Sequence, residues 1–265
     1  MKLQDGSFEI ISFFGIMGLC IRLNVDFIMS GHSQFHNIMY RKGAQDAKRA
    51  KIFAKISREI TVSTKMGGSD ADTNPRLRAA LSLARASNMP KDNIEKAKAK
   101  ALNSGDNASY DDIRYEGYGP GGVAIIVETL TDNRNRTAPD MRSAFAKFGG
   151  SLGETGSVVF SFNRVGHIIY DAIGYDKAME VAIENGADNV EENDGCVEIT
   201  MSVESFASVR DAFIKAIGEP IESGLIWAPS VLIPCSDETK TTLMKLIDVL
   251  EDNDDVQRVF HNMQS

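Results

Sequence analysis

The sequence predicts an α+β protein of three domains, an N-terminal helical bundle followed by two α+β domains, one of them inserted in the other. Three observations support this class. Residues 30–105 have the apolar spacing of helices, and from Asp106 onward strand-like and helix-like segments alternate. The elements from Val165 to Pro229 follow the order β-α-β-β-α-β, which indicates a ferredoxin-like unit.

The first expected helix covers Ala44–Thr61. Its apolar positions recur at the spacing of one buried helical face: Ile52, Phe53, Ile56 and Ile60. At 100° per residue its basic side chains fall on a separate stripe: Lys48, Lys51, Lys55 and Arg58. Arg49 lies toward the apolar face instead, where its aliphatic stem can pack.

Two shorter helices complete the expected bundle. The second begins with Asn74 as N-cap and Pro75 in its first turn, and extends to about Ala86. The third begins near Pro90 and places Ile94, Ala97 and Ala101 on one face.

After residue 105 the pattern becomes mixed. A β-branched strand is expected at Gly122–Leu130, preceded by a glycine-rich turn, and a helix at Thr137–Lys147, where Thr137 and Asp140 have capping-box spacing. A further strand is expected at Ser157–Asn163.

The ferredoxin-like block and the tail follow. The block consists of strand Val165–Asp171, helix Lys177–Asn185, strands Val190–Asn193 and Cys196–Ser202, helix Ser205–Ile217 and strand Ile221–Pro229. The tail adds a helix at Glu238–Leu250 and a strand at Val256–His261. We therefore expect a helical domain at 30–105, an α+β domain at 106–163 plus 230–265, and an inserted ferredoxin-like domain at 164–229.

Residues 1–29 are expected to be a leader outside the native protein, with translation starting at Met29. The apolar run Ile10–Ile21 spans about twelve residues, short of the roughly twenty that cross a bilayer. It is preceded by Asp5 and Glu9 and followed by no small-residue cleavage site, so it is a poor signal peptide. We expect no membrane partner.

Composition indicates an ordinary globular protein, with 43% hydrophobic and 25% charged residues. The three cysteines, Cys20, Cys196 and Cys235, have neither zinc-type nor C-x-x-C spacing. This usage indicates a reducing compartment, and we expect a cytoplasmic location.

Charge is strongly segregated along the chain. Residues 30–100 contain fifteen Lys and Arg against six Asp and Glu, whereas residues 101–265 contain twelve against twenty-eight. Like charges gathered in one folding unit repel one another, so a partner that carries phosphates is a natural reason to keep them. Few acidic residues are interleaved for i,i+4 pairing, which weakens the alternative of a merely solvated helix face.

The candidate contacts to nucleic acid lie in this basic block. Cations hold phosphates and set register, while polar side chains reach base edges or sugar hydroxyls. The candidates are His32, Ser33, Asn37, Arg41, Lys42, Lys48, Arg49, Lys51, Lys55, Arg58, Arg76 and Arg78.

Other chemistry is not indicated. No Ser/His/Asp or Cys/His set, cofactor motif or metal-ligand spacing can be assembled, so we expect no enzyme, no cofactor and no small-molecule substrate. Residues 132–137 could bind an anion at a helix N-terminus, or form a capped loop with paired Arg and Asp. The acidic cluster Glu251–Asp255 lacks the pattern of a calcium loop and is expected to be a solvated helix end.

Several blocks, in order, resemble the signature of the YebC family. They are Ser30–Asn37, Ala44–Lys55, Asn74–Ala79, Tyr115–Gly122, Asp132–Thr137 and Leu250–Val256. The resemblance runs from about Met29 to about Asn262, and the family's Met-x-Gly-His-Ser start aligns with Met29–Ser33.

The resemblance implies a helical domain followed by two α+β domains, one inserted in the other, and no catalytic residues. It also implies a cytoplasmic, DNA-binding transcriptional regulatory protein. Mitochondrial relatives are translational activators, and some bacterial members are associated with the ribosome. We therefore expect transcriptional regulation through DNA binding; the alternative is a translation factor that binds ribosomal RNA with the same surface. A helix-turn-helix with a short turn is not evident in the sequence.

Overall fold

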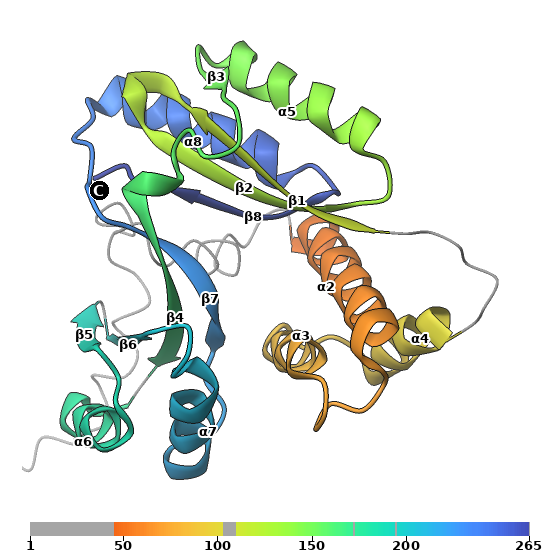
Figure 1. The fold of residues 1–265 in the computed structure, drawn as a ribbon, viewed down its shortest axis with the longest axis vertical. Coiled ribbons are helices and arrows are strands. Elements are labelled where there is room, and N and C mark those ends of the chain that lie inside the picture. Colours follow the sequence, from red (N-terminus) through yellow and green to blue (C-terminus); the bar gives the residue numbers. More distant parts are fainter. Residues whose placement is uncertain (1–44, 103–109, 172, 194, 265) are drawn as a thin grey trace, which may run out of the picture.

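The structure is a computed structural model that describes residues 45–102, 110–171, 173–193 and 195–264 (Figure 1). These residues form a helical part and two four-stranded antiparallel sheets, which confirms the α+β class. No helix among the described residues is long and apolar enough to cross a membrane.

The helical part consists of α2 (Gln45–Gly67), α3 (Pro75–Ala86) and α4 (Lys91–Leu102), and both shorter helices pack on α2. The predicted apolar face of α2 is confirmed, since Ile56 and Ile60 are buried and Ile52 and Phe53 are partly buried in the shared core. Helix α2 extends beyond the predicted end at Thr61 because residues 61–64 are buried as well.

Asn74 is the N-cap of α3, as predicted. Its side-chain oxygen accepts a hydrogen bond from the Leu77 N–H at 3.1 Å. Its amide nitrogen donates to the carbonyls of Ser63 at 2.7 Å and Gly68 at 2.9 Å. One buried side chain therefore both starts α3 and holds it against the end of α2.

The first sheet has the order β3-β1-β2-β8, and α5 and α8 cover one of its faces (Figure 1). Its elements are β1 (Asp111–Tyr118), β2 (Ala124–Thr131), α5 (Arg134–Lys147), β3 (Ser151–Leu152), α8 (Asp237–Glu251) and β8 (Val256–His261). Ile125 and Val127 of β2 face the core beneath the helices, whereas Ala124 and Ile126 belong to a second cluster with Phe162. Burial on both faces explains the uninterrupted apolar run of β2.

The second sheet has the order β5-β6-β4-β7, the arrangement of a ferredoxin-like unit, and α6 and α7 pack on it. Its elements are β4 (Phe162–Asp171), α6 (Tyr175–Asn185), β5 (Asn189–Asn193), β6 (Cys196–Met201), α7 (Phe206–Ala216) and β7 (Glu222–Pro229). All of them lie in the chain between β3 and α8 of the first sheet, so the second sheet is built from one uninterrupted stretch.

Two local features differ from the sequence analysis. Strand β1 was not expected because its charged residues hide the strand pattern; Glu116 is buried there, accepting hydrogen bonds from the N–H groups of Val158 and Val159. The predicted strand at Ser157–Asn163 is wrong. A single 3-10 turn occupies Val159–Ser161, and β4 begins at Phe162, where its pairing with β7 begins opposite Pro229.

Replacing Asn74 by Ala should lower the free energy of unfolding by about 2–3 kcal/mol, because a buried cap and two carbonyl partners are lost together. Chemical denaturation measures this. The matched control is Ser236→Ala, which removes the exposed N-cap of α8 and should cost about 1 kcal/mol or less. Equal losses in the two variants would contradict the role assigned to Asn74.

Candidate nucleic-acid interface

The basic stripe of α2 faces the acidic segment between α8 and β8. Lys51 Nζ lies 2.9 Å from Asp252 Oδ1, and Lys55 Nζ donates to the Glu251 carbonyl at 2.6 Å. Arg58 donates to the carbonyl of Asp254. The expectation that residues 251–255 form a solvated helix end is confirmed only in part. Helix α8 ends at Glu251, and Asp252 and Asp254 are exposed, but the segment contacts α2 and its last residue, Asp255, is only 3% exposed.

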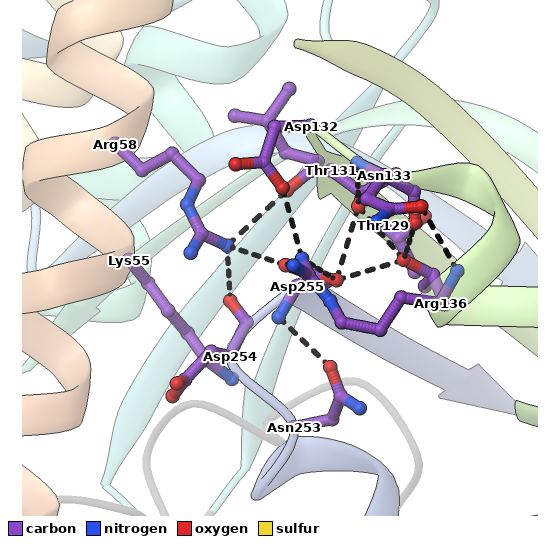
Figure 2. Close-up of polar contacts among 12 residues, drawn as sticks. Lys55, Arg58, Thr129, Thr131, Asp132, Asn133, Arg136, Asn253, Asp254 and Asp255 are labelled. Atoms are coloured by element: carbon purple, nitrogen blue, oxygen red, sulfur yellow. Dashed lines mark hydrogen bonds and ion pairs between the residues drawn. The ribbon is translucent and has the colours of Figure 1, made fainter. Parts of the chain in front are cut away.

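Figure 2 shows the Asp255 carboxylate at the centre of a polar cluster. It accepts hydrogen bonds from the Thr131 hydroxyl at 3.0 Å and the Thr137 hydroxyl at 2.8 Å. Arg136 Nη2 donates to Oδ2 at 2.7 Å, and Arg58 Nη1 lies 3.3 Å from Oδ1. Two cations and two hydroxyls therefore satisfy one buried carboxylate.

The environment of Asp255 favours its charged form. Burial by itself would raise the pKa of this carboxyl, but hydrogen bonds from Arg136, Thr137 and Thr131 outweigh it and hold the pKa below its ordinary value of 3.8. Lys55 shows the opposite balance, since burial lowers the pKa of its amine despite the nearby Glu251 and Asp254 carboxylates.

The loop after β2 is a capped loop with paired charges, the second of the two alternatives for residues 132–137. Arg134 pairs with Asp111 at 2.8 Å, and Arg136 pairs with Asp132 and Asp255. The predicted capping box at Thr137 is wrong: α5 begins at Arg134 with Asn133 as N-cap, since the hydroxyl of Thr137 is directed to Asp255.

Arg76 and Arg78 connect α3 with its surroundings. Arg76 bridges Glu59 of α2 and Asp112 of β1, and hydrogen bonds to these two carboxylates raise the pKa of its guanidinium. Arg78 donates to the carbonyl of Ala71 at 3.0 Å and lies 3.7 Å from Asp211 of α7. These two predicted residues therefore make structural contacts within the chain.

A groove between α2 and α4 presents cations in a different setting. It has a volume of about 410 Å³, and we call it the α2–α4 groove. It is lined by Ala54, Ser57, Arg58, Thr61, Asn93, Lys96, Ala97, Lys100 and Tyr110. Three of these described lining residues are cationic and none is acidic, and the Arg58 guanidinium lies 5.8 Å from the centre of the Tyr110 ring.

The structure separates the sequence-predicted residues into groups. Lys51, Lys55, Arg76 and Arg78 line one central cavity, while Arg58 lines the α2–α4 groove. Arg49 lies on the outside of α2, with its guanidinium 5.9 Å from the centre of the Phe53 ring, as its position toward the apolar face suggested. Outside the described part of the chain are His32, Ser33, Asn37, Arg41, Lys42 and the side chain of Lys48.

Sequence reasoning missed the contribution of α4 to the groove. Lys96 and Lys100 are four residues apart and Asn93 is three before Lys96, so the three share a helical face. The spacing was readable, but the side of α2 on which α4 packs was not.

The fold and this groove define a protein of three parts whose helical part carries a cationic groove. The chain belongs to the TACO1/YebC family. Residues 33–104 match the family's N-terminal domain, and residues 110–263 match its second and third domains. A crystal structure of a conserved hypothetical protein from Aquifex aeolicus is similar, with 37% identity and a TM-score of 0.76, over 83% of this chain and 91% of that chain.

Replacing Asp255 by Asn should destabilise the protein by about 2–3 kcal/mol at neutral pH, because the charge-assisted hydrogen bonds of a buried carboxylate are lost and only the exposed Asp132 is left to pair with Arg136. The folded-state pKa of Asp255 is lowered. Its stabilising effect is therefore complete above the unfolded pKa and is lost as the pH falls through the folded value.

The difference in stability between wild type and Asp255→Asn should therefore shrink as the pH is lowered below about 4 in denaturation experiments. Asp254→Asn is the matched control, because Asp254 is exposed and contacts Arg58 through its backbone carbonyl. A pH-independent difference, or an equal loss in the control, would refute the role of the Asp255 carboxylate.

Proposed function

We propose that this protein regulates gene expression by binding DNA through its basic helical domain. The observation that carries the proposal is the α2–α4 groove, which combines three cations with hydroxyl and amide groups and has no carboxylate among its described lining residues. Such a surface attracts a phosphate backbone, and neutral hydrogen-bonding groups beside it suit sugar or base-edge contacts.

The two cationic surfaces of α2 differ in what nucleic acid must displace. On the stripe, a phosphate that contacts Lys51 or Lys55 competes with Asp252 and the Glu251 carbonyl. In the groove, a phosphate that contacts Lys96 would compete with no carboxylate of the described lining. We therefore propose the groove as the first contact with DNA. Binding of DNA by the stripe residues stays a prediction, because it requires the segment between α8 and β8 to move away from α2.

Duplex DNA is favoured by how α3 and α4 are connected. Four residues, Ser87–Pro90, join them, a turn length that is compatible with a helix-turn-helix pair. In such pairs the second helix contacts the DNA, and here α4 carries Lys91, Lys96, Lys98 and Lys100. The name of the family model matched by residues 110–263 also refers to transcriptional regulation. The proposed role is cytoplasmic and not enzymatic.

Replacing both Lys96 and Lys100 by Gln should weaken binding to duplex DNA about tenfold or more at moderate salt, because two phosphate contacts are lost. The slope of log affinity against log salt concentration should fall by about 1.8, at roughly 0.9 per phosphate contact. Fluorescence anisotropy over a salt series measures both quantities.

The matched control removes the same charge elsewhere, with Lys177→Gln and Lys215→Gln on the exposed faces of α6 and α7. If both double variants lost the same affinity for duplex DNA, only the net charge of the protein would matter, and the groove would be refuted as the DNA-binding surface. The same titration with ribosomal RNA addresses the alternative. Tighter binding to that RNA, with sequence-independent binding to DNA, would replace the transcriptional proposal by translation.

A further inference from the structure

A second cationic surface lies away from the groove, in the cavity between the helical part and the two sheets. The cavity has a volume of about 970 Å³, and α2, α3, β1, β7 and β8 all contribute to its lining. This volume is at the upper end of those found for small-molecule sites in proteins. One part of its wall, where the two sheets meet, contains Arg114, Arg164 and Arg258.

The strand register places a row of charges across the first sheet. Arg114 of β1 and Arg258 of β8 are both paired in register with Glu128 of β2, so the three side chains share one face. A third guanidinium, from Arg164 of β4, donates to Glu128 Oε1 at 2.8 Å. Three arginines from three strands therefore gather around one carboxylate.

Trp227, the chain's only tryptophan, stands inside this cluster. The Arg114 and Arg164 guanidinium carbons lie 5.0 and 4.8 Å from the centre of its ring. Its indole N–H donates to Glu128 Oε1 at 2.9 Å, the same oxygen that Arg164 uses. The ring holds both cations in position from the side of β7.

The cluster carries more positive than negative charge. Arg114 is offset by Glu116, which lies 2.8 Å away, and Arg164 by Glu128. Arg258 forms no ion pair with a described carboxylate; it donates to the Leu225 carbonyl at 2.9 Å, beside Gly224, where a side chain would crowd its guanidinium. Burial lowers the pKa of Arg164, and repulsion by Arg258 and Arg114 adds to this despite the attraction of Glu128.

Three other carboxylates on the cavity wall are paired with cations outside this cluster. Glu59 and Asp112 pair with Arg76, and Asp252 pairs with Lys51. The excess positive charge near Arg258 is thus not cancelled by these three groups. An anion that enters the cavity would meet guanidinium groups, which bind phosphate oxygens through two parallel hydrogen bonds.

We propose that Arg114, Arg164 and Arg258 form a binding site for the phosphate group of a nucleotide or of a nucleic-acid strand, with Trp227 beside it. The site lies on the two sheets and shares no residue with the α2–α4 groove. It is therefore independent of the proposed DNA contact. Failure of the proposal for this site would not refute the proposal for the groove, nor the reverse.

The single tryptophan makes the site directly observable. Titration of the full protein with pyrophosphate, ATP and a short single-stranded oligonucleotide should change Trp227 fluorescence saturably with at least one probe. Arg258→Gln should weaken that binding about fivefold or more, because a charged guanidinium contact is lost. Arg142→Gln, an exposed arginine of α5 away from the cavity, is the matched control and should leave the affinity unchanged.

The probes distinguish the two sources of phosphate. Saturation by pyrophosphate and ATP identifies a free nucleotide as the ligand, whereas saturation by the oligonucleotide alone identifies a strand. Lys96→Gln with Lys100→Gln should leave the free-nucleotide titrations unchanged, which separates this test from that of the groove.

Isothermal titration calorimetry detects binding of a probe that leaves the Trp227 fluorescence unchanged. The proposal is overturned if neither method detects saturable binding of any probe. It is also overturned if the Arg258→Gln variant is folded, as judged by its melting curve, and binds the probes as tightly as the Arg142→Gln variant does.

Discussion

The buried carboxylate of Asp255 is the contact on which the arrangement of the chain depends. A charge with 3% exposure needs partners, and here they come from α2, from the end of β2 and from the start of α5. These elements are far apart in the sequence. Meeting at one carboxylate fixes α2 against the first sheet and fixes the α8–β8 segment in the same step.

This contact divides the basic surface of α2 into two parts. The part that faces the α8–β8 segment is neutralised by carbonyls and carboxylates of the same chain, as Lys51 and Lys55 show. The part that faces α4 stays lined by cations without a described carboxylate. Arg58 lies between them, since it reaches Asp255 and also lines the α2–α4 groove. The acidic half of the chain thus pairs with Lys51 and Lys55 but adds no carboxylate to the described lining of the groove.

The same arrangement creates the central cavity. Helix α3 packs against β7, and Arg76 and Arg78 tie it to β1 and to α7. The two sheets close the opposite side, where Arg164 of one donates to Glu128 of the other. Cations from the helical part and from both sheets therefore surround one space, although the C-terminal residues as a whole are strongly acidic.

Local sequence by itself determined the elements whose signals lie within a few residues. The N-cap at Asn74, the apolar face of α2, the β-α-β-β-α-β order and the last strand, Val256–His261, were all readable because capping, periodicity and strand alternation are short-range. Tertiary structure decided what depends on distant partners. Strand β1 forms despite its charges because Glu116 finds backbone donors around Val158. Asp255 is buried because Arg58, more than 190 residues earlier in the chain, lies beside it. Charge counts showed that residues 30–100 are basic, but only the packing of α2 against its neighbours determined which of those charges face protein and which line a groove.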